Sequence, residues 1–221
     1  MKPAWKRNFK DWITPDVVEA FGLVEDNAHP PFRDWVDAEP VASPEALPLL
    51  ENRRRMLARY YAGWNETELM MHFIAPLFYS VSFEGKNYGT FFHRKLNVVI
   101  DGQPLGGIAD ALVATGVYDP VKPFFFLNEY KRSQGYTADP QGQLLAAMVA
   151  AQHLNNSPRV VYGSFIIGKF CTFALLDGQT LALSQGYDLI DPQEIQTVWA
   201  ILQRTKQRIE AEVAALEAAE A

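Results

Sequence analysis

An apolar run that ends in two charged residues constrains the fold more than any other feature of the chain. Residues 124–127 are all apolar, and Glu129-Tyr130-Lys131 follow after a single asparagine. A short apolar run rich in aromatic residues is typical of a buried β-strand. Because side chains alternate between the faces of a strand, Phe125 and Leu127 are predicted to share one face with both charged residues. Burying charges beside phenylalanines costs several kcal/mol each unless they are paired or bind a metal.

The Glu-x-Lys triplet carries little information on its own. Charged residues make up about a quarter of an average chain, so roughly one acidic-x-lysine triplet is expected by chance in this length. A second copy, Glu84-Gly85-Lys86, is present. Its glycine and the following Asn87 indicate a turn, and no apolar strand leads into it, so we expect an exposed loop there.

A lone carboxylate, Asp110, lies on the strand that is predicted to precede the triplet. Its neighbours are apolar or glycine, and strand alternation places Ile108, Asp110 and Leu112 on one face. Upstream, residues 90–100 predict another strand, and Asp101-Gly102 is a hairpin signal that joins the two. Three consecutive strands are therefore expected. A purely structural alternative makes Asp110 a buried hydrogen-bond acceptor.

A helix is predicted before these strands, and it offers a further carboxylate. Asn65 and Glu68 have the spacing of a capping box, which gives Glu68 a structural role. Three apolar residues follow Glu66 at the i+4, i+7 and i+11 positions of one helix face: Met70, Phe73 and Leu77. Glu66 therefore lies on the stripe that faces the core and is favoured as a site residue. A first-turn carboxylate that interacts with the helix dipole is the alternative.

A second helix and a further strand are predicted after the triplet. Asp139-Pro140 supply an N-cap and a first-turn proline, and residues 159–167 have the composition of a strand. The order helix, three strands, helix, strand resembles the core of the PD-(D/E)XK nuclease superfamily. The matching residues are Glu66, Asp110, Glu129-Tyr130-Lys131 and Gln143. Residues 64–77 are also similar to small, uncharacterised bacterial members of this superfamily and to the nuclease segment of restriction-system subunits.

The resemblance implies a fold, a cofactor and a reaction. The fold is α/β, with a restriction-endonuclease-like core, a mixed central sheet and added N- and C-terminal helices. The implied metal ligands are Asp110, Glu129 and Glu66, with Mg²⁺ or Mn²⁺ as the cofactor, and Lys131 assists the attacking water. Carboxylates hold such a metal, which polarises a phosphate and acidifies water. The expected function is metal-dependent phosphodiester hydrolysis of nucleic acid, with a DNA endonuclease as the first choice.

The second predicted helix is expected to support this site. The superfamily often carries a glutamine there, and Gln143, or else Gln141, occupies that place. The chain departs from the family pattern at two positions. Ala147 stands where an aromatic residue is usual one turn later, and Ala109 replaces the proline often found before the aspartate.

Two other interpretations fit the same residues. The chain could form a catalytically inactive nuclease-like module that binds nucleic acid or a protein partner, because a fold does not fix a function. The triplet could also be a buried salt bridge in an unrelated α/β scaffold. In that case Glu129→Gln is expected mainly to reduce stability.

The charge of the chain limits how it can bind a polyanion. With 20 Lys and Arg against 26 Asp and Glu, the formal net charge is −6, which argues against a broad electrostatic grip on nucleic acid. Much of this excess lies at residues 210–221, which carry four glutamates and no lysine or arginine. His93, Arg94 and Lys95 adjoin the predicted site and are the expected nucleic-acid contacts, with a solvated surface as the alternative.

Three segments are expected along the 221 residues. Residues 1–63 predict an N-terminal extension, helical and rich in proline, residues 64–190 the nuclease-like α/β core, and residues 191–221 a C-terminal helix. The C-terminal helix has an apolar seam that Lys206 interrupts. This seam is expected to pack on its own domain or to pair with a second copy in a homodimer.

The remaining signals concern compartment and cofactors. With one cysteine, no apparent signal peptide and no uncharged apolar run of bilayer length, a cytoplasmic protein without membrane contact is expected. Residues 163–169 have the spacing of a phosphate-binding loop, but Phe170 replaces the Ser or Thr that would hold Mg²⁺. A hairpin that turns at Gly168 is predicted instead, and no nucleotide cofactor is expected.

Overall fold

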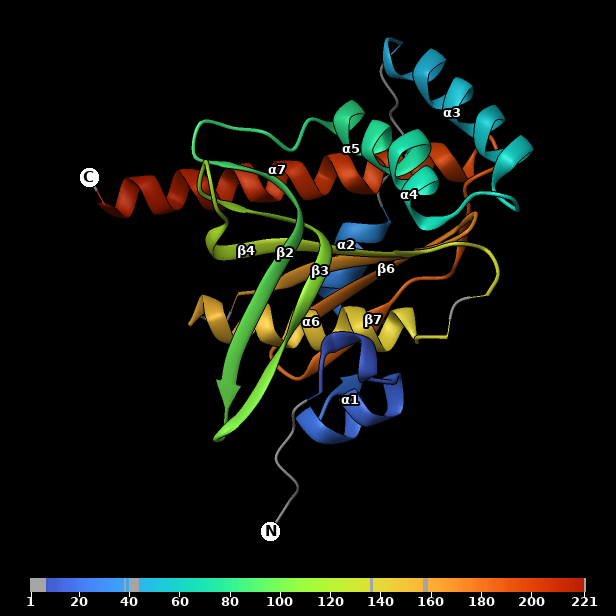
Figure 1. Cartoon of the computed structure of the whole chain (residues 1–221). Helices are drawn as coiled ribbons and strands as arrows, with labels where there is room; N and C mark the ends of the chain where they lie inside the picture. Colours follow the sequence, from blue (N-terminus) through green and yellow to red (C-terminus); the bar gives the residue numbers. More distant parts are fainter. Residues whose placement is uncertain (1–6, 38, 40–43, 136, 157–158, 221) are drawn as a thin grey trace.

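One mixed sheet organises the chain, and its strands come from most of the sequence (Figure 1). The computed structural model describes residues 7–37, 39, 44–135, 137–156 and 159–220. Within these residues, eight strands pair in the order β1-β7-β6-β5-β4-β3-β2, and β8 pairs with β6. The strands are β1 (Val24–Glu25), β2 (Tyr88–Ile100), β3 (Gln103–Thr115), β4 (Val121–Lys131), β5 (Val161–Ile167), β6 (Phe170–Asp177), β7 (Thr180–Leu183) and β8 (Tyr187–Asp188).

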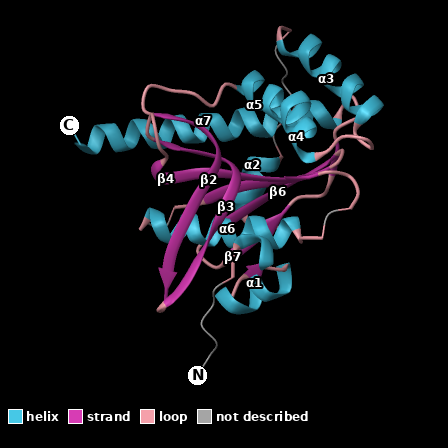
Figure 2. Ribbon diagram, viewed as in Figure 1, coloured by secondary structure: helices cyan, strands magenta, loops and turns pink. Residues whose placement is uncertain are grey.

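Helices cover both faces of the sheet, as Figure 2 shows. One face carries a short 3-10 helix (Phe9–Asp11), α1 (Thr14–Phe21) and α6 (Pro140–Asn155). The other face carries α2 (Pro30–Val36), α3 (Ala46–Tyr60), α4 (Glu66–Leu69), a π-helical turn (Met70–Ile74), α5 (Ala75–Val81) and α7 (Glu194–Glu220). Apolar side chains fill a separate core on each face, here called the α6 core and the α7 core. The result is a three-layer α/β/α arrangement.

The predicted order of elements is observed. After α4 and α5 come β2, β3 and β4, which pair antiparallel, and then α6 and β5. Strand β5 lies beside β4 and runs parallel to it, so α6 is the crossover helix between two parallel neighbours. The α/β class and the mixed sheet are thereby confirmed. The N-terminal segment joins the same sheet and layers, since β1 pairs with β7 and α1 packs against α6.

Local sequence signals set several of the element ends. Asp101 and Gly102 both have positive φ, 50° and 77°, in the β2–β3 turn, as the hairpin signal predicts. The capping box of Asn65 with Glu68 forms at the start of α4, and both of its hydrogen bonds are present. Gly168 turns β5 into β6, so the segment that resembles a phosphate-binding loop is the predicted hairpin.

The predicted alternation along β4 is wrong at the aromatic run. The pairing of β3 with β4 shifts by one residue, so that Phe125 has no partner between Phe124 and Phe126. This bulge places Phe125 beside Phe126 in the α7 core, whereas Leu127 lies in the α6 core. Phe125 and Leu127 therefore do not share a face. After the bulge, the side chains toward Glu129 and Lys131 alternate in the opposite order from that expected from Phe125.

The predicted alternation is also wrong around Asp110. Ala109 and Leu112 both lie in the α6 core, although residues three apart in a regular strand point to opposite faces. Ile108, next to Ala109, has 51% of its surface exposed and lies away from that core. The two-residue repeat of β3 thus changes phase at Asp110, so Ile108 and Leu112 do not share an apolar face.

The change of phase involves both strands of the β2–β3 hairpin. On β2, Phe91 and Leu96 lie in the α6 core five residues apart, so the repeat changes phase there as well. The paired positions of the two strands are continuous except at His93 and Asp110, which face each other. His93 has a left-handed backbone with φ of 53°, far from the values of an extended strand. This pair is called the His93–Asp110 step below.

The apolar seam of α7 packs inside the molecule. Its buried residues, all in the α7 core, are Ile195, Trp199, Leu202, Ile209 and Val213. The turns after Val213 are mostly exposed, and Leu216 is half-buried. The seam is therefore largely covered by its own domain, and the homodimer stays a prediction. Neither α7 nor any other helix in the described ranges is long and apolar enough to cross a membrane.

Asp139 ties α6 to the N-terminal segment, and its removal should be costly. Thr14 donates from its backbone N–H and its hydroxyl to Asp139 Oδ2, at 2.7 and 2.8 Å, and Gly142 N–H donates to Oδ1 at 3.1 Å. Asp139→Ala should lower the free energy of unfolding by about 2 kcal/mol, because it removes a helix cap and an anchor together. Urea unfolding measures the loss.

The control for this variant is Asp119→Ala in the exposed β3–β4 turn. Surface substitutions of this kind change stability by about 0.5 kcal/mol or less. Equal losses in the two variants would contradict the anchoring role of Asp139.

Candidate functional site

Two charged side chains at the end of β4, Glu129 and Lys131, meet Asp110 of β3. Lys131 Nζ lies 2.5 Å from Glu129 Oε1 and 3.6 Å from Asp110 Oδ2. The ammonium also donates to the backbone oxygen of Tyr130 at 3.1 Å. The residues that the sequence predicts as the centre of a site are thus brought together. Asp110, Glu129 and Lys131 are called the charged trio, in which two carboxylates share one ammonium.

Glu129 is the most buried member of the charged trio, with 2% of its side chain exposed. Burial raises the pKa of Glu129 well above its usual value, and the Asp110 carboxylate raises it further, while Lys131 opposes both effects. Burial is the largest cause of this shift, and the second carboxylate adds to it. One proton on the carboxylate pair would bring the formal charge of the three groups from −1 to zero.

Lys131 is held in its charged form. Burial alone would lower the pKa of Lys131, but the attraction of Glu129 and Asp110 outweighs burial, and the pKa is raised. The side chain is 10% exposed, so it is reachable from solvent at the edge of the trio. A lysine with a raised pKa is a cation and a hydrogen-bond donor at neutral pH, which suits it to hold a water or an anionic oxygen and not to remove a proton.

Tyr130 links the two strands at this point. Its backbone N–H donates to Asp110 Oδ2 at 3.2 Å, and its hydroxyl lies 3.3 Å from His93 Nε2. Burial, and then three nearby carboxylates, raise the pKa of Tyr130, so its hydroxyl keeps the proton at neutral pH. These carboxylates belong to Asp110, Glu129 and Glu66. The sequence predicts no role for Tyr130, and its place inside the triplet is the only local signal for one.

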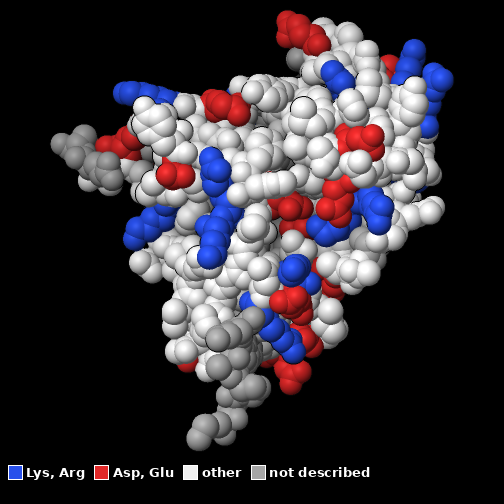
Figure 3. Space-filling model, in the orientation of Figure 1, with Lys and Arg blue, Asp and Glu red and all other residues white. Residues whose placement is uncertain are grey.

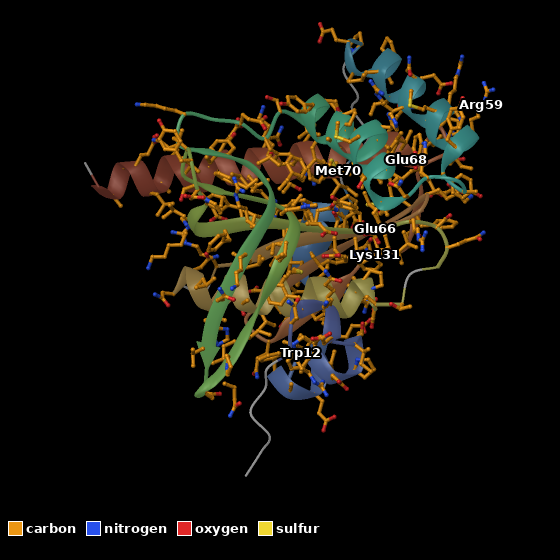
Figure 4. All side chains as sticks on the ribbon, viewed as in Figure 1. Trp12, Arg59, Glu66, Glu68, Met70 and Lys131 are labelled. Carbon is orange, nitrogen blue, oxygen red and sulfur yellow. The ribbon has the colours of Figure 1, made fainter. Side chains whose placement is uncertain are left out.

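A depression of about 470 Å³ opens beside Lys131. It is lined by the start of α4, which contributes Glu66 and Thr67, and by the loop after β4, which contributes Arg132. Figure 4 places Glu66 next to Lys131, and Figure 3 shows acidic and basic side chains gathered at this part of the face. Glu68 is exposed and accepts the capping hydrogen bond from Asn65. Glu66 is therefore the carboxylate of α4 that reaches the depression.

Gln143 is buried in α6 with 7% of its surface exposed. Its Oε1 atom has no hydrogen-bond partner among the described residues. A buried acceptor without a partner is costly, which makes this atom available to a water or a cation. Gln141 is only partly buried. No hydrogen bond in the described segments joins either glutamine to the charged trio, so the supporting role of Gln143 stays a prediction.

The predicted set of three metal-binding carboxylates is not assembled. In the part of the chain that the structure describes, no three His, Cys, Asp or Glu side chains lie together as a metal site. Asp110 and Glu129 interact directly, whereas Glu66 lies on the wall of the depression beside Lys131. The pair still suits Mg²⁺ or Mn²⁺, because it offers hard oxygen donors with an uncompensated negative charge. Mg²⁺ is commonly held by one or two carboxylates, with waters and phosphate oxygens completing its shell.

The predicted nucleic-acid contacts lie on β2, next to the charged trio. His93 and Lys95 are exposed, and Arg94 is half-buried, with its guanidinium 5.8 Å from the centre of the Phe91 ring. Figure 3 shows Lys and Arg side chains over the part of this face where Figure 1 draws β2. Within the described ranges no carboxylate forms an ion pair with Arg94 or Lys95, so both charges are available to an anionic partner.

The second Glu-x-Lys triplet is the exposed loop that the sequence predicts. Residues 84–86 are exposed between α5 and β2. A glutamate and a lysine two residues apart thus occur once at the buried end of a strand and once in solvent. The exposed copy provides a matched control for the buried one.

Comparisons with known proteins do not identify a family for this chain. No model of a known protein family matches the sequence. No curated protein is similar enough to match it either.

Glu129→Gln should stabilise the protein, increasingly so as pH rises. The folded state holds the pKa of Glu129 above the usual value of 4.5, so the wild type loses stability as pH rises from there through the folded pKa. Glutamine cannot ionise, and it keeps an oxygen that can accept from Lys131. Thermal unfolding over this pH range measures the gap between the two proteins, at about 2–4 °C per kcal/mol for a chain of this size.

The gap should vanish at the acid end, where Glu129 is protonated in the folded and the unfolded protein. A lower unfolding temperature of Glu129→Gln at neutral pH would instead identify the charged trio as a stabilising salt bridge.

Proposed function

We propose that this protein hydrolyses phosphodiester bonds in nucleic acid with a divalent metal, and that it acts on DNA as an endonuclease. The observation that carries the proposal is the charged trio, in which two carboxylates share one ammonium at the edge of a depression. A structural ion pair needs one carboxylate for one ammonium. The additional buried carboxylate costs stability unless a further cation neutralises it. That requirement fits a site built to take up a divalent metal.

The element order supports a restriction-endonuclease-like core. A helix, three antiparallel strands, a crossover helix and a parallel strand follow one another along the chain. Asp110 lies on the second of these strands, and Glu129 and Lys131 end the third. These are the places that the PD-(D/E)XK resemblance predicts for the catalytic residues.

The residues of the site divide the chemical work by their charge and burial. When bound, Mg²⁺ or Mn²⁺ supplies a Lewis acid that polarises a phosphate and acidifies a water. Asp110 and Glu129 would hold the metal. Lys131, which is protonated, would orient the attacking water or stabilise negative charge on the phosphate. Glu66, on the wall of the depression, would contact the metal shell through a water.

Cleavage is the direct test of this proposal. Purified protein in Mg²⁺ or Mn²⁺ should nick supercoiled plasmid, and labelled single strands report any activity on unpaired DNA. Asp110→Ala and Lys131→Ala should each lower the rate by about 100-fold or more, because each removes a group that acts on developing charge. Lys86→Ala, in the exposed copy of the triplet, should cut like the wild type.

Two results would contradict the assignment. Loss of activity in Lys86→Ala would point to a different site. Unchanged cleavage in Asp110→Ala, with folding verified by its unfolding curve, would exclude the charged trio as the active site.

Metal binding can be tested separately from cleavage. Calorimetric titration with Mn²⁺ should show binding that is lost in Asp110→Ala. Because Glu129 must release its proton to become a ligand, the affinity should increase with pH, and titrations in two buffers with different ionisation enthalpies should reveal proton release. The exposed variant Glu84→Ala is the control and should bind Mn²⁺ like the wild type.

A second function is favoured by the missing third ligand. Since no three-ligand group is assembled in the described residues, the alternative is an inactive nuclease-like module that binds nucleic acid or a protein partner. Such a module would bind DNA, or a protein, without dependence on Mn²⁺ and without cleavage. Absence of Mn²⁺ binding in the wild type would decide for this alternative.

A further inference from the structure

A left-handed residue lies inside β2, next to the proposed active site. Among the described residues, the non-glycine positions with positive φ are Ser82, His93, Asp101 and Asn156. Ser82 and Asn156 follow the last residues of α5 and α6, and Asp101 lies in a hairpin turn, which are ordinary places for this conformation. His93 differs, because it lies within the 13 residues of a strand.

The conformation of His93 is unfavourable for a residue with a side chain. Glycine adopts φ of about +50° without steric cost, whereas other residues clash with their own backbone there. A sequence that needed only the bend would be served best by glycine at position 93. Strained residues of this kind cluster at active sites and ligand contacts, where the surrounding structure holds them. The side chain of His93 is therefore the part that needs an explanation.

The ring of His93 is held on one side and open on the other. Nε2 lies 3.3 Å from the Tyr130 hydroxyl, and the backbone N–H of the same tyrosine donates to Asp110. His93 is exposed, and no described residue forms a hydrogen bond with its Nδ1 atom. If the Tyr130 hydroxyl donates to Nε2, the neutral ring carries its proton on Nδ1 and offers a donor to solvent. Tyr130 thus connects the position of this ring to the position of Asp110.

We propose that His93 contacts the substrate, with Nδ1–H donating to a phosphate oxygen next to the scissile bond. This inference rests on the proposed function, because it takes the Asp110 end of the charged trio as the place of the scissile phosphate. Arg94 follows His93 on β2 and would bind a neighbouring phosphate of the same strand, whereas the side chain of Lys95 points to the opposite face of β2. The left-handed backbone at the His93–Asp110 step sets the direction of the ring.

The test separates the ring from the bend. His93→Gly keeps the left-handed backbone and removes the ring, and it should unfold at a higher temperature than His93→Ala, which keeps the steric strain. Both variants should bind a fluorescein-labelled DNA duplex about tenfold to a hundredfold more weakly than the wild type, the range for losing a hydrogen bond to a charged group. Fluorescence anisotropy in EDTA and in Ca²⁺ measures the affinity, and cleavage in Mg²⁺ should show the loss mainly in KM.

Two further variants keep the test independent of folding. Ser82→Gly makes the same backbone change at a helix end and should leave both affinity and cleavage unchanged. His93→Asn tolerates the left-handed conformation and lacks the imidazole, so it should weaken binding like His93→Gly even if the glycine variant folds poorly.

The outcomes distinguish this inference from the proposed function. Binding without cleavage by the wild type, with a loss of affinity in His93→Gly, would reject the nuclease and keep the phosphate contact. Cleavage by the wild type with equal affinity and KM in His93→Gly and His93→Asn would keep the nuclease and overturn the contact. Neither binding nor cleavage by the wild type would overturn both.

Discussion

Two carboxylates that share one ammonium, in a place with little access to water, are the constraint on which the rest of the site depends. Coulomb attraction is strong there, but so is the cost of an unmatched charge. The raised pKa of Glu129 is the direct consequence, since burial and the neighbouring carboxylate both disfavour its anion. Without a metal, the raised pKa of Glu129 favours a proton on the carboxylate pair. The composition of the charged trio thus exceeds what an ion pair that serves the fold alone would require.

The scaffold places this group where the sheet meets a depression. Strand β4 lies between β3 and β5, so Glu129 is buried by neighbours on both sides, while Lys131 at the strand end reaches the wall that α4 provides. The bulge at Phe125 and the His93–Asp110 step change which face the side chains occupy along β2, β3 and β4. Irregular strands of this kind re-aim side chains without breaking the sheet. Of these irregularities, the His93–Asp110 step includes a residue of the charged trio, whereas the β3–β4 shifts lie toward the other end of those two strands.

Features that depend on neighbouring residues are predicted from the sequence, whereas features that depend on tertiary contacts are not. The capping box at Asn65, the turn at Asp101-Gly102 and the hairpin at Gly168 depend on neighbouring residues, and the sequence predicts each of them. The meeting of Asp110 with Glu129 and Lys131 also follows from two adjacent strands. The changes in side-chain alternation along β2, β3 and β4 do not follow from the local sequence. They depend on which strand residues pack against the α6 core and which against the α7 core. The separation of Glu66 from the carboxylate pair also depends on tertiary packing. Helix periodicity predicts which face Glu66 occupies, but not its distance from Asp110 and Glu129.

On the proposed function, Lys131 would have to change its contacts when a metal binds. Its ammonium lies 2.5 Å from Glu129 and also bonds the Tyr130 carbonyl, so its donors are engaged in neutralising the site. A lysine bound in this way is poorly placed to hold an attacking water. If a divalent cation takes over the charge of both carboxylates, Lys131 is free to turn toward the depression beside Glu66 and Arg132. Metal uptake would then do two things at once, supplying the Lewis acid and releasing the lysine. On the proposed function, Lys131 would serve as counter-ion in one state and as donor to the reaction in the other.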